Sequence, residues 1–90
     1  MGIDDAEKIS ILMMQINANI DQSVALVKDK SSEDEFVEYR QMAGQAMGRV
    51  IDILNSLYIK HPELKPKQLG GTYEVAPSVF EKKFYSGKNS

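Results

Sequence analysis

The chain has 90 residues, a net charge of −2, one histidine and no cysteine. The lack of cysteine excludes disulfides. With one histidine, any metal site would consist almost wholly of carboxylates, and the sequence contains no calcium-binding loop motif that would supply them. A chain this short buries only about 60 to 65% of the surface it exposes when unfolded, so we expect oligomerisation to complete its core, and we predict no cofactor.

The charges are distributed unevenly along the chain. Residues 1–59 carry five basic and ten acidic side chains, a net of −5, whereas residues 60–90 carry six basic and three acidic ones, a net of +3. A nucleic-acid-binding domain usually has a basic face on its folded body, so the acidic body argues against a nucleic-acid partner. The N-terminus is acidic and no uncharged apolar run approaches a membrane span, which predicts a cytoplasmic protein without membrane contact.

The first predicted element is a helix over residues 4–28. Its main apolar stripe repeats every three or four residues, is widened by Leu12, and consists of Ala6, Ile9, Met13, Ile16, Ile20, Val24 and Val27. A second stripe lies nearly opposite the first on the helical wheel and consists of Ile11, Met14, Ala18 and Ala25. A helix that is apolar on two sides needs two neighbours, and a hairpin supplies only one.

A turn at residues 28–31 separates this helix from a second one, predicted over residues 32–60. Ser32 followed by Glu35 is a capping pattern for a helix start, and Pro62 predicts the end. The apolar stripe makes six steps in the 21 residues from Phe36 to Leu57, a mean spacing typical of antiparallel helices that supercoil gently. Its members are Phe36, Tyr39, Ala43, Met47, Val50, Leu54 and Leu57, broadened by Ala46, Ile51, Ile53 and Tyr58.

Two glycines interrupt the middle of the second helix. Gly44 and Gly48 are four residues apart and share a face. Each glycine costs about 1 kcal/mol relative to alanine in a helix interior, which predicts a compensating close contact with another helix.

Together these elements predict an all-α protein with a helical hairpin over residues 1–69 and a tail over residues 70–90. Two antiparallel hairpins are expected to form a homodimeric four-helix bundle. The predicted self-interface consists of Ile11, Met14, Ala18, Ala25, Gly44, Met47 and Gly48.

The tail is basic and aromatic. It contains four of the seven aromatic residues, and because disordered tails are poor in such residues, we predict that it docks on its own chain, on the second copy or on a partner. Residues 72–75 alternate like a short strand, and residues 77–85 are compatible with a short helix. The docking candidates are Tyr73, Val75, Val79, Phe80, Phe84 and Tyr85.

No pattern in the chain indicates catalysis. His61 precedes Pro62 at a helix end, where a surface or capping role is expected, and the acidic residues after Ser32 match the positive end of the helix dipole. Nucleophile and phosphate-loop motifs are absent. We therefore predict a protein that is not an enzyme and has no catalytic, cofactor-binding or metal-binding residues.

The second helix and its exit carry a recognisable run of residues. The run begins Ser32-x-x-Glu35-Phe36-x-x-Tyr39-Arg40 and continues through Gly44-x-x-Met47-Gly48 and Asp52-Ile53-Leu54-Asn55. It ends Tyr58-x-x-His61-Pro62-Glu63-Leu64-Lys65-Pro66. It resembles a recurrent pattern in short uncharacterised bacterial helical-hairpin proteins. The resemblance implies a bacterial hairpin protein, brings no activity with it, and does not extend over the aromatic tail.

These observations favour a non-enzymatic protein–protein interaction module, a small adaptor or regulator that acts as a homodimer. One alternative is an inhibitor, chaperone or immunity-type protein that covers a partner. The other is a small ligand-binding subunit or enzyme with a site between protomers, which the lack of pocket chemistry disfavours.

Overall fold

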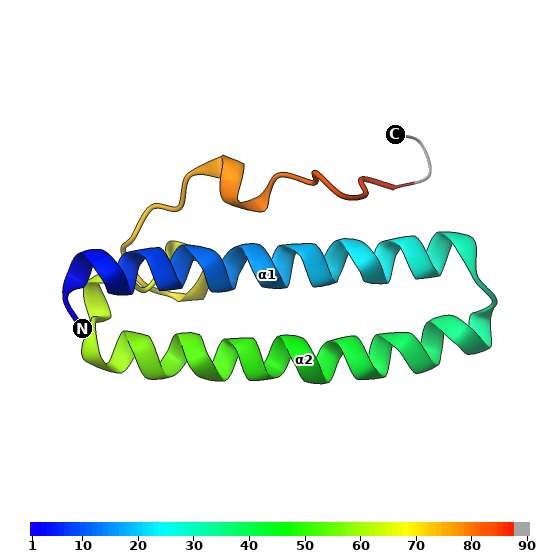
Figure 1. The fold of residues 1–90 in the computed structure, drawn as a ribbon, viewed down its shortest axis with the longest axis horizontal. Coiled ribbons are helices and arrows are strands. Elements are labelled where there is room, and N and C mark those ends of the chain that lie inside the picture. The colour runs from blue at the N-terminus through cyan, green and yellow to red at the C-terminus, as the bar shows by residue number, and fades with distance from the viewer. Residues whose placement is uncertain (88–90) are drawn as a thin grey trace.

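The computed structural model describes residues 1–87; the last three residues of the predicted tail, Lys88 among them, lie outside the described part. Two long antiparallel helices form the body (Figure 1): α1 spans Ile3–Lys30 and α2 spans Glu33–Lys60. They confirm the predicted all-α helical hairpin. Three short 3-10 turns follow, η1 at Pro62–Leu64, η2 at Lys67–Leu69 and η3 at Pro77–Phe80.

Local sequence explains where the second helix begins and ends. The Ser32 hydroxyl accepts a hydrogen bond from the Glu35 backbone N–H at 3.2 Å, which satisfies one of the free donors of the first turn. Three acidic residues occupy that turn, where their negative charges interact favourably with the positive end of the helix dipole. At the other end His61 leaves helical geometry directly before Pro62, as the sequence predicts.

Polar contacts across the hairpin fix the register of the two helices. Ser10 and Tyr58 share a buried hydrogen bond of 2.6 Å near the open end, and the Tyr39 hydroxyl donates to Ser23 Oγ at 2.7 Å near the turn. The two helices and the residues that follow α2 together form an apolar core. The buried cluster consists of Ala6, Met14, Leu54, Leu57, Tyr58, Leu64 and Val79.

A tight reversal after η2 turns the chain back toward α1. The Tyr73 N–H donates to the Lys65 carbonyl at 3.0 Å, and the Lys67 N–H donates to the Tyr73 carbonyl at 3.0 Å. Gly71 lies so close to Lys65 that an added Cβ would be 2.0 Å from the Lys65 carbonyl oxygen. Gly70 has a left-handed backbone with φ of 89°, which glycine adopts without strain.

The tail beyond this reversal runs along α1 in the same direction as the helix (Figure 1), so that tail, α1 and α2 form three layers. Tyr73 lies near Glu7, and Tyr85 lies near Asp29. The helix between these partners rises about 33 Å, and twelve steps of extended chain span about 40 Å, so the tail is nearly extended. The predicted strand is reduced to a single bridge between Pro66 and Tyr73, and the predicted helix to the turn η3.

Gly71→Ala is expected to lower the free energy of unfolding by about 1 to 3 kcal/mol, because the Lys65 backbone must move away from the new methyl group. The matched control is Gly44→Ala, since an added Cβ at Gly44 meets nothing within 4 Å. That change should raise stability by up to about 1 kcal/mol through helix propensity. Urea unfolding followed by circular dichroism measures both, and equal effects of the two variants would contradict the role given to the reversal.

Candidate functional site

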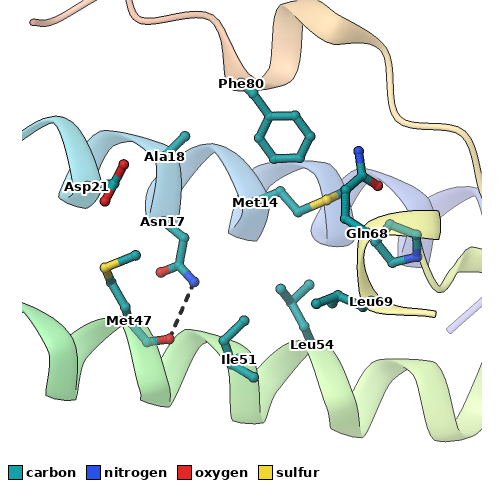
Figure 2. A pocket seen from close by; sticks show the side chains of 11 residues that line it. Met14, Asn17, Ala18, Asp21, Met47, Ile51, Leu54, Gln68, Leu69 and Phe80 are labelled. Atoms are coloured by element: carbon teal, nitrogen blue, oxygen red, sulfur yellow. Dashed lines mark hydrogen bonds between the residues drawn. The ribbon is translucent and has the colours of Figure 1, made fainter. Parts of the chain in front are cut away.

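An apolar groove of about 260 Å³ lies on one side of the hairpin, where α1, α2 and the C-terminal segment meet (Figure 2). Helix α1 contributes Met14, Asn17, Ala18 and Asp21, and α2 contributes Met47, Ile51 and Leu54. The segment after α2 closes the rest of the groove with Pro66, Gln68, Leu69 and Phe80. Three elements that are distant in the sequence therefore build one hollow.

The Asn17 side chain points from α1 toward α2 within this groove (Figure 2). Its Nδ2 donates a hydrogen bond of 3.3 Å to the Met47 carbonyl oxygen. Its Oδ1 is shielded from solvent and has no hydrogen-bond partner. Buried acceptors are normally paired, so this oxygen marks the groove as a site with unmet hydrogen-bonding capacity.

The two glycines of α2 adjoin the groove. Gly44 and Gly48 precede Ile51 by seven and three residues, which places all three on one face of α2. Both glycines are exposed, and an added Cβ at either meets nothing within 4 Å. The predicted close contact is therefore not made within the described chain and stays a prediction for a second molecule.

The opposite side of the hairpin, here called the outer flank, consists of Leu12, Met42, Ala46 and Ile53. Leu12 is 50% exposed, Met42 56% and Ile53 48%. Ile53 lines a shallow hollow together with Ile9, and Leu12 follows Ile9 by one helical turn, so both helices contribute to the same flank. The sequence assigns Leu12 and Ile53 to the edges of the two core stripes, and Met42 is one of four methionines on the two helices that can serve either a core or an adaptable binding surface.

The tail docks on α1 through polar contacts at both of its ends. The Tyr73 hydroxyl donates to Glu7 Oε2 at 2.7 Å, and the Tyr85 hydroxyl donates to Asp29 Oδ2 at 2.5 Å. Gln22, which is 3% exposed, accepts with Oε1 from the backbone N–H groups of Phe84 and Tyr85, at 2.7 and 3.0 Å. Sequence patterning does not reveal Gln22, because an uncharged polar residue in a helix normally faces solvent.

The predicted docking residues are used in different ways. Val79 is buried in the core cluster, and Val75 and Tyr73 are half-buried against it. Phe80 is 40% exposed and forms a wall of the groove, whereas the Phe84 side chain is 63% exposed. The tail therefore docks on its own chain and leaves two phenylalanine rings partly open.

The predicted self-interface residues are dispersed over three environments. Met14 is 6% exposed, and Ile11 is half-buried against the same core cluster, so the single chain already covers both. Ala18 and Met47 line the groove with Met14, Ala25 is half-buried, and Gly44 and Gly48 are open. Their contact with a second copy stays a prediction.

Titratable groups do not converge in the described part of the chain. His61 Nδ1 lies 3.9 Å from Glu63 Oε1 at the end of α2, away from the groove. Among residues 1–87 no group of three or more histidine, cysteine, aspartate or glutamate side chains is placed to hold a metal ion. Within the same residues no helix is both long and apolar enough to cross a membrane.

The groove, the outer flank and the docked tail thus define a helical hairpin with two uncovered surfaces. No family model matches the chain, and no curated protein or solved structure does so. The resemblance of residues 32–66 to short bacterial hairpin proteins therefore stays a prediction, and any function must be argued from the surfaces themselves.

Gln22→Leu tests the central anchor of the tail. The change leaves two backbone N–H groups without their acceptor, and an unpaired buried donor costs about 1 to 3 kcal/mol. We expect amide exchange at Phe84 and Tyr85 to accelerate by at least about tenfold in hydrogen-exchange NMR, with α2 amides unchanged. Gln41→Leu, at an exposed position of α2, is the control and should leave both tail amides protected.

The two tyrosine anchors give the tail a dependence on alkaline pH. Hydrogen bonding to the Glu7 carboxylate raises the pKa of Tyr73 above its ordinary value of 10.0, and loss of hydration and the carboxylate charge act in the same direction. The Asp29 carboxylate raises the pKa of Tyr85 in the same way. Each phenol therefore stabilises docking fully below pH 10, and this contribution is lost as the pH rises above that value.

Carbon NMR of the tyrosine rings measures this effect directly. The Tyr73 and Tyr85 signals should titrate above pH 10, and the tail amides should lose protection over the same range. Glu7→Ala should lower the pKa of Tyr73 alone, and Asp29→Ala that of Tyr85 alone. Ordinary titration of both tyrosines in the unaltered protein would refute the two carboxylate contacts.

Proposed function

We propose that the chain is a non-enzymatic protein–protein interaction module that acts as a homodimer. The observation that supports this most directly is the outer flank, where Leu12, Met42 and Ile53 each keep about half of their surface exposed. Leu12 and Ile53 lie on the two helices beside the half-buried Ile9, and contiguous apolar surface of this kind is usually covered by another molecule. A second copy of the chain carries an identical flank, so a two-fold contact buries both at once.

The dimensions of the hairpin suit such a contact. A helix of 28 residues is about 42 Å long, and two hairpins packed flank to flank form a four-helix bundle. Fully burying one large apolar side chain contributes about 1.5 to 3 kcal/mol, and roughly half of that gain is still open at each of the three positions. Two copies thus gain six such contributions, roughly 4 to 9 kcal/mol before the cost of association is subtracted, so other contacts around the flank must also contribute to a dimer at micromolar concentration.

The groove supports a binding role over a catalytic one. Its single ionisable lining residue is Asp21, which is exposed. General acid or base chemistry requires a titratable group within hydrogen-bonding reach of a reacting atom, usually with a partner that tunes its pKa. The apolar walls instead suit burial of a side chain. As for its place in the cell, the cysteine-free sequence fits a reducing compartment such as the cytoplasm, and the resemblance of residues 32–66 to short bacterial hairpin proteins favours a bacterium.

Self-association is tested by light scattering with two polar substitutions on the outer flank. The parent protein should show twice the chain mass at micromolar concentration, and the double variant Leu12→Gln and Ile53→Gln should weaken the dimer by about 100-fold or more through lost apolar burial. Ile59→Gln is the matched control, because Ile59 is 82% exposed and lies on another side of α2.

A parent protein that is monomeric at these concentrations would rule out the homodimer. If Ile59→Gln dissociated the dimer as strongly as the double variant, the dimer would be real but the outer flank would not be its interface.

A further inference from the structure

The size of the groove limits what it can hold. An engineered apolar cavity of about 150 Å³ accepts benzene, whereas pockets for drug-sized ligands span about 300 to 1,000 Å³. At about 260 Å³ the groove has room for one larger aromatic ring system and is smaller than a typical ligand pocket. A single aromatic anchor from a larger partner matches this space.

The chemistry of the groove adds a second requirement. The hydrogen bond from Asn17 Nδ2 to the Met47 carbonyl oxygen fixes the orientation of the amide, since a flipped amide would place two acceptors against each other. Asn17 Oδ1 is left as an acceptor without a partner. The Met47 side chain lies beside this amide (Figure 2) and, being unbranched, can change rotamer to let a donor reach the oxygen. The occupant should therefore carry an N–H or O–H donor.

This chain does not itself hold a free donor of that kind. It contains no tryptophan, and all four tyrosine hydroxyls already form hydrogen bonds, with Ser10, Ser23, Glu7 and Asp29. A second copy therefore offers no spare aromatic donor unless its own contacts break. A tryptophan of another protein meets both requirements, because a buried indole N–H needs an acceptor and indole rings are frequent interface anchors.

The surroundings of the groove indicate how such an anchor is presented. Gly44 and Gly48 leave the adjoining face of α2 without side chains, so a helical backbone can approach closely. Asp21 is exposed at the rim and makes no ion pair with a described residue, and it is the one charged residue that lines the groove. A basic amphipathic helix fits this combination of shape and charge.

We propose that the groove is the docking site for a basic helical segment of a second protein, which inserts one tryptophan whose indole N–H donates to Asn17 Oδ1. The inference rests on the proposed role as an interaction module in taking the occupant to be a protein. It assigns Asn17 as the residue that selects a ring with a donor, and Ala18 and Met47 as the walls that receive the ring.

The anchor site is tested first with free indole, compared with indene, which has the same shape but no N–H. In a titration of the full chain followed by amide NMR, indole should shift the amides of Met14, Ala18, Met47 and Ile51. Indene should bind about three- to tenfold more weakly, the effect of one hydrogen bond. In Asn17→Leu, which removes the acceptor, the two affinities should become equal. Equal affinities in the parent protein, or shifts confined to other residues, would overturn the proposal.

A matched pair of substitutions controls for folding. Ala18→Leu fills the groove and should abolish indole binding, whereas Ala25→Leu, two turns along the same face and outside the groove lining, should preserve it. Thermal melting of each variant shows that it is folded. Indole binding that survives Ala18→Leu in a folded protein would place the site elsewhere and refute the inference.

The source of the ring is tested with a lysine-rich amphipathic helical peptide that carries one tryptophan, compared with the same peptide carrying leucine. The tryptophan peptide should bind at least tenfold more tightly, with its preference lost in Asn17→Leu. Binding of free indole without any preference between the peptides would identify a small-molecule site and overturn the protein-anchor proposal. Light scattering of the same samples separates the two hypotheses: a monomer that binds indole contradicts only the homodimer, and a dimer that does not bind it contradicts only the anchor site.

Discussion

The structure depends on one constraint, which is that α1 must be covered on two sides. Between Ile9 and Ile20 this helix has no charged residue, so neither its α2-facing side nor the side that carries Ile11 and Met14 is suited to water. Helix α2 covers the first side, and the residues after α2 return to cover the second. The short turns, the reversal at Gly70 and Gly71, and the extended tail together bring the chain back over this second side of α1.

The segment after α2 covers the side of α1 that carries Ile11 and Met14 only in part. The apolar surface that it leaves open is available to a partner. The tail is anchored to α1 by hydrogen bonds at Glu7, Gln22 and Asp29, whereas its apolar contribution to the core is mainly Val79. Phe80 therefore stands at the edge of the core as a wall of the groove. Polar anchoring of this kind holds a chain in place without requiring close-packed apolar contact along its length, which is why a hollow remains beneath it.

Sequence periodicity predicts the hairpin well because each helix repeats its apolar residues over many turns, and because Ser32 and Pro62 mark ends through local chemistry. The aromatic content of the tail likewise predicts docking. The path of the tail is not predictable in this way, since it is set by single long-range contacts such as that of Gln22, whose partners are backbone groups of any sequence. The role of Asn17 is likewise not predictable from the sequence, because it depends on the missing hydrogen-bond partner of Asn17 Oδ1. Periodicity assigns Leu12 and Ile53 to the edges of the core stripes, because a helical wheel does not show how far α2 wraps around α1.

The parallel course of the tail along α1 has a consequence for the order in which the protein is made and folds. Helices α1 and α2 meet through contacts that begin at the turn, such as Tyr39 with Ser23, and can close as soon as residue 60 has left the ribosome. Tyr73 and Tyr85, by contrast, find partners that were synthesised 66 and 56 residues earlier. Contacts of such long sequence separation form late, so each newly made hairpin passes through an interval in which Met14 is bare. During that interval the hairpin exposes the apolar side of α1 that residues 73–85 cover in the folded chain, so docking of these residues removes a surface that would otherwise favour aggregation.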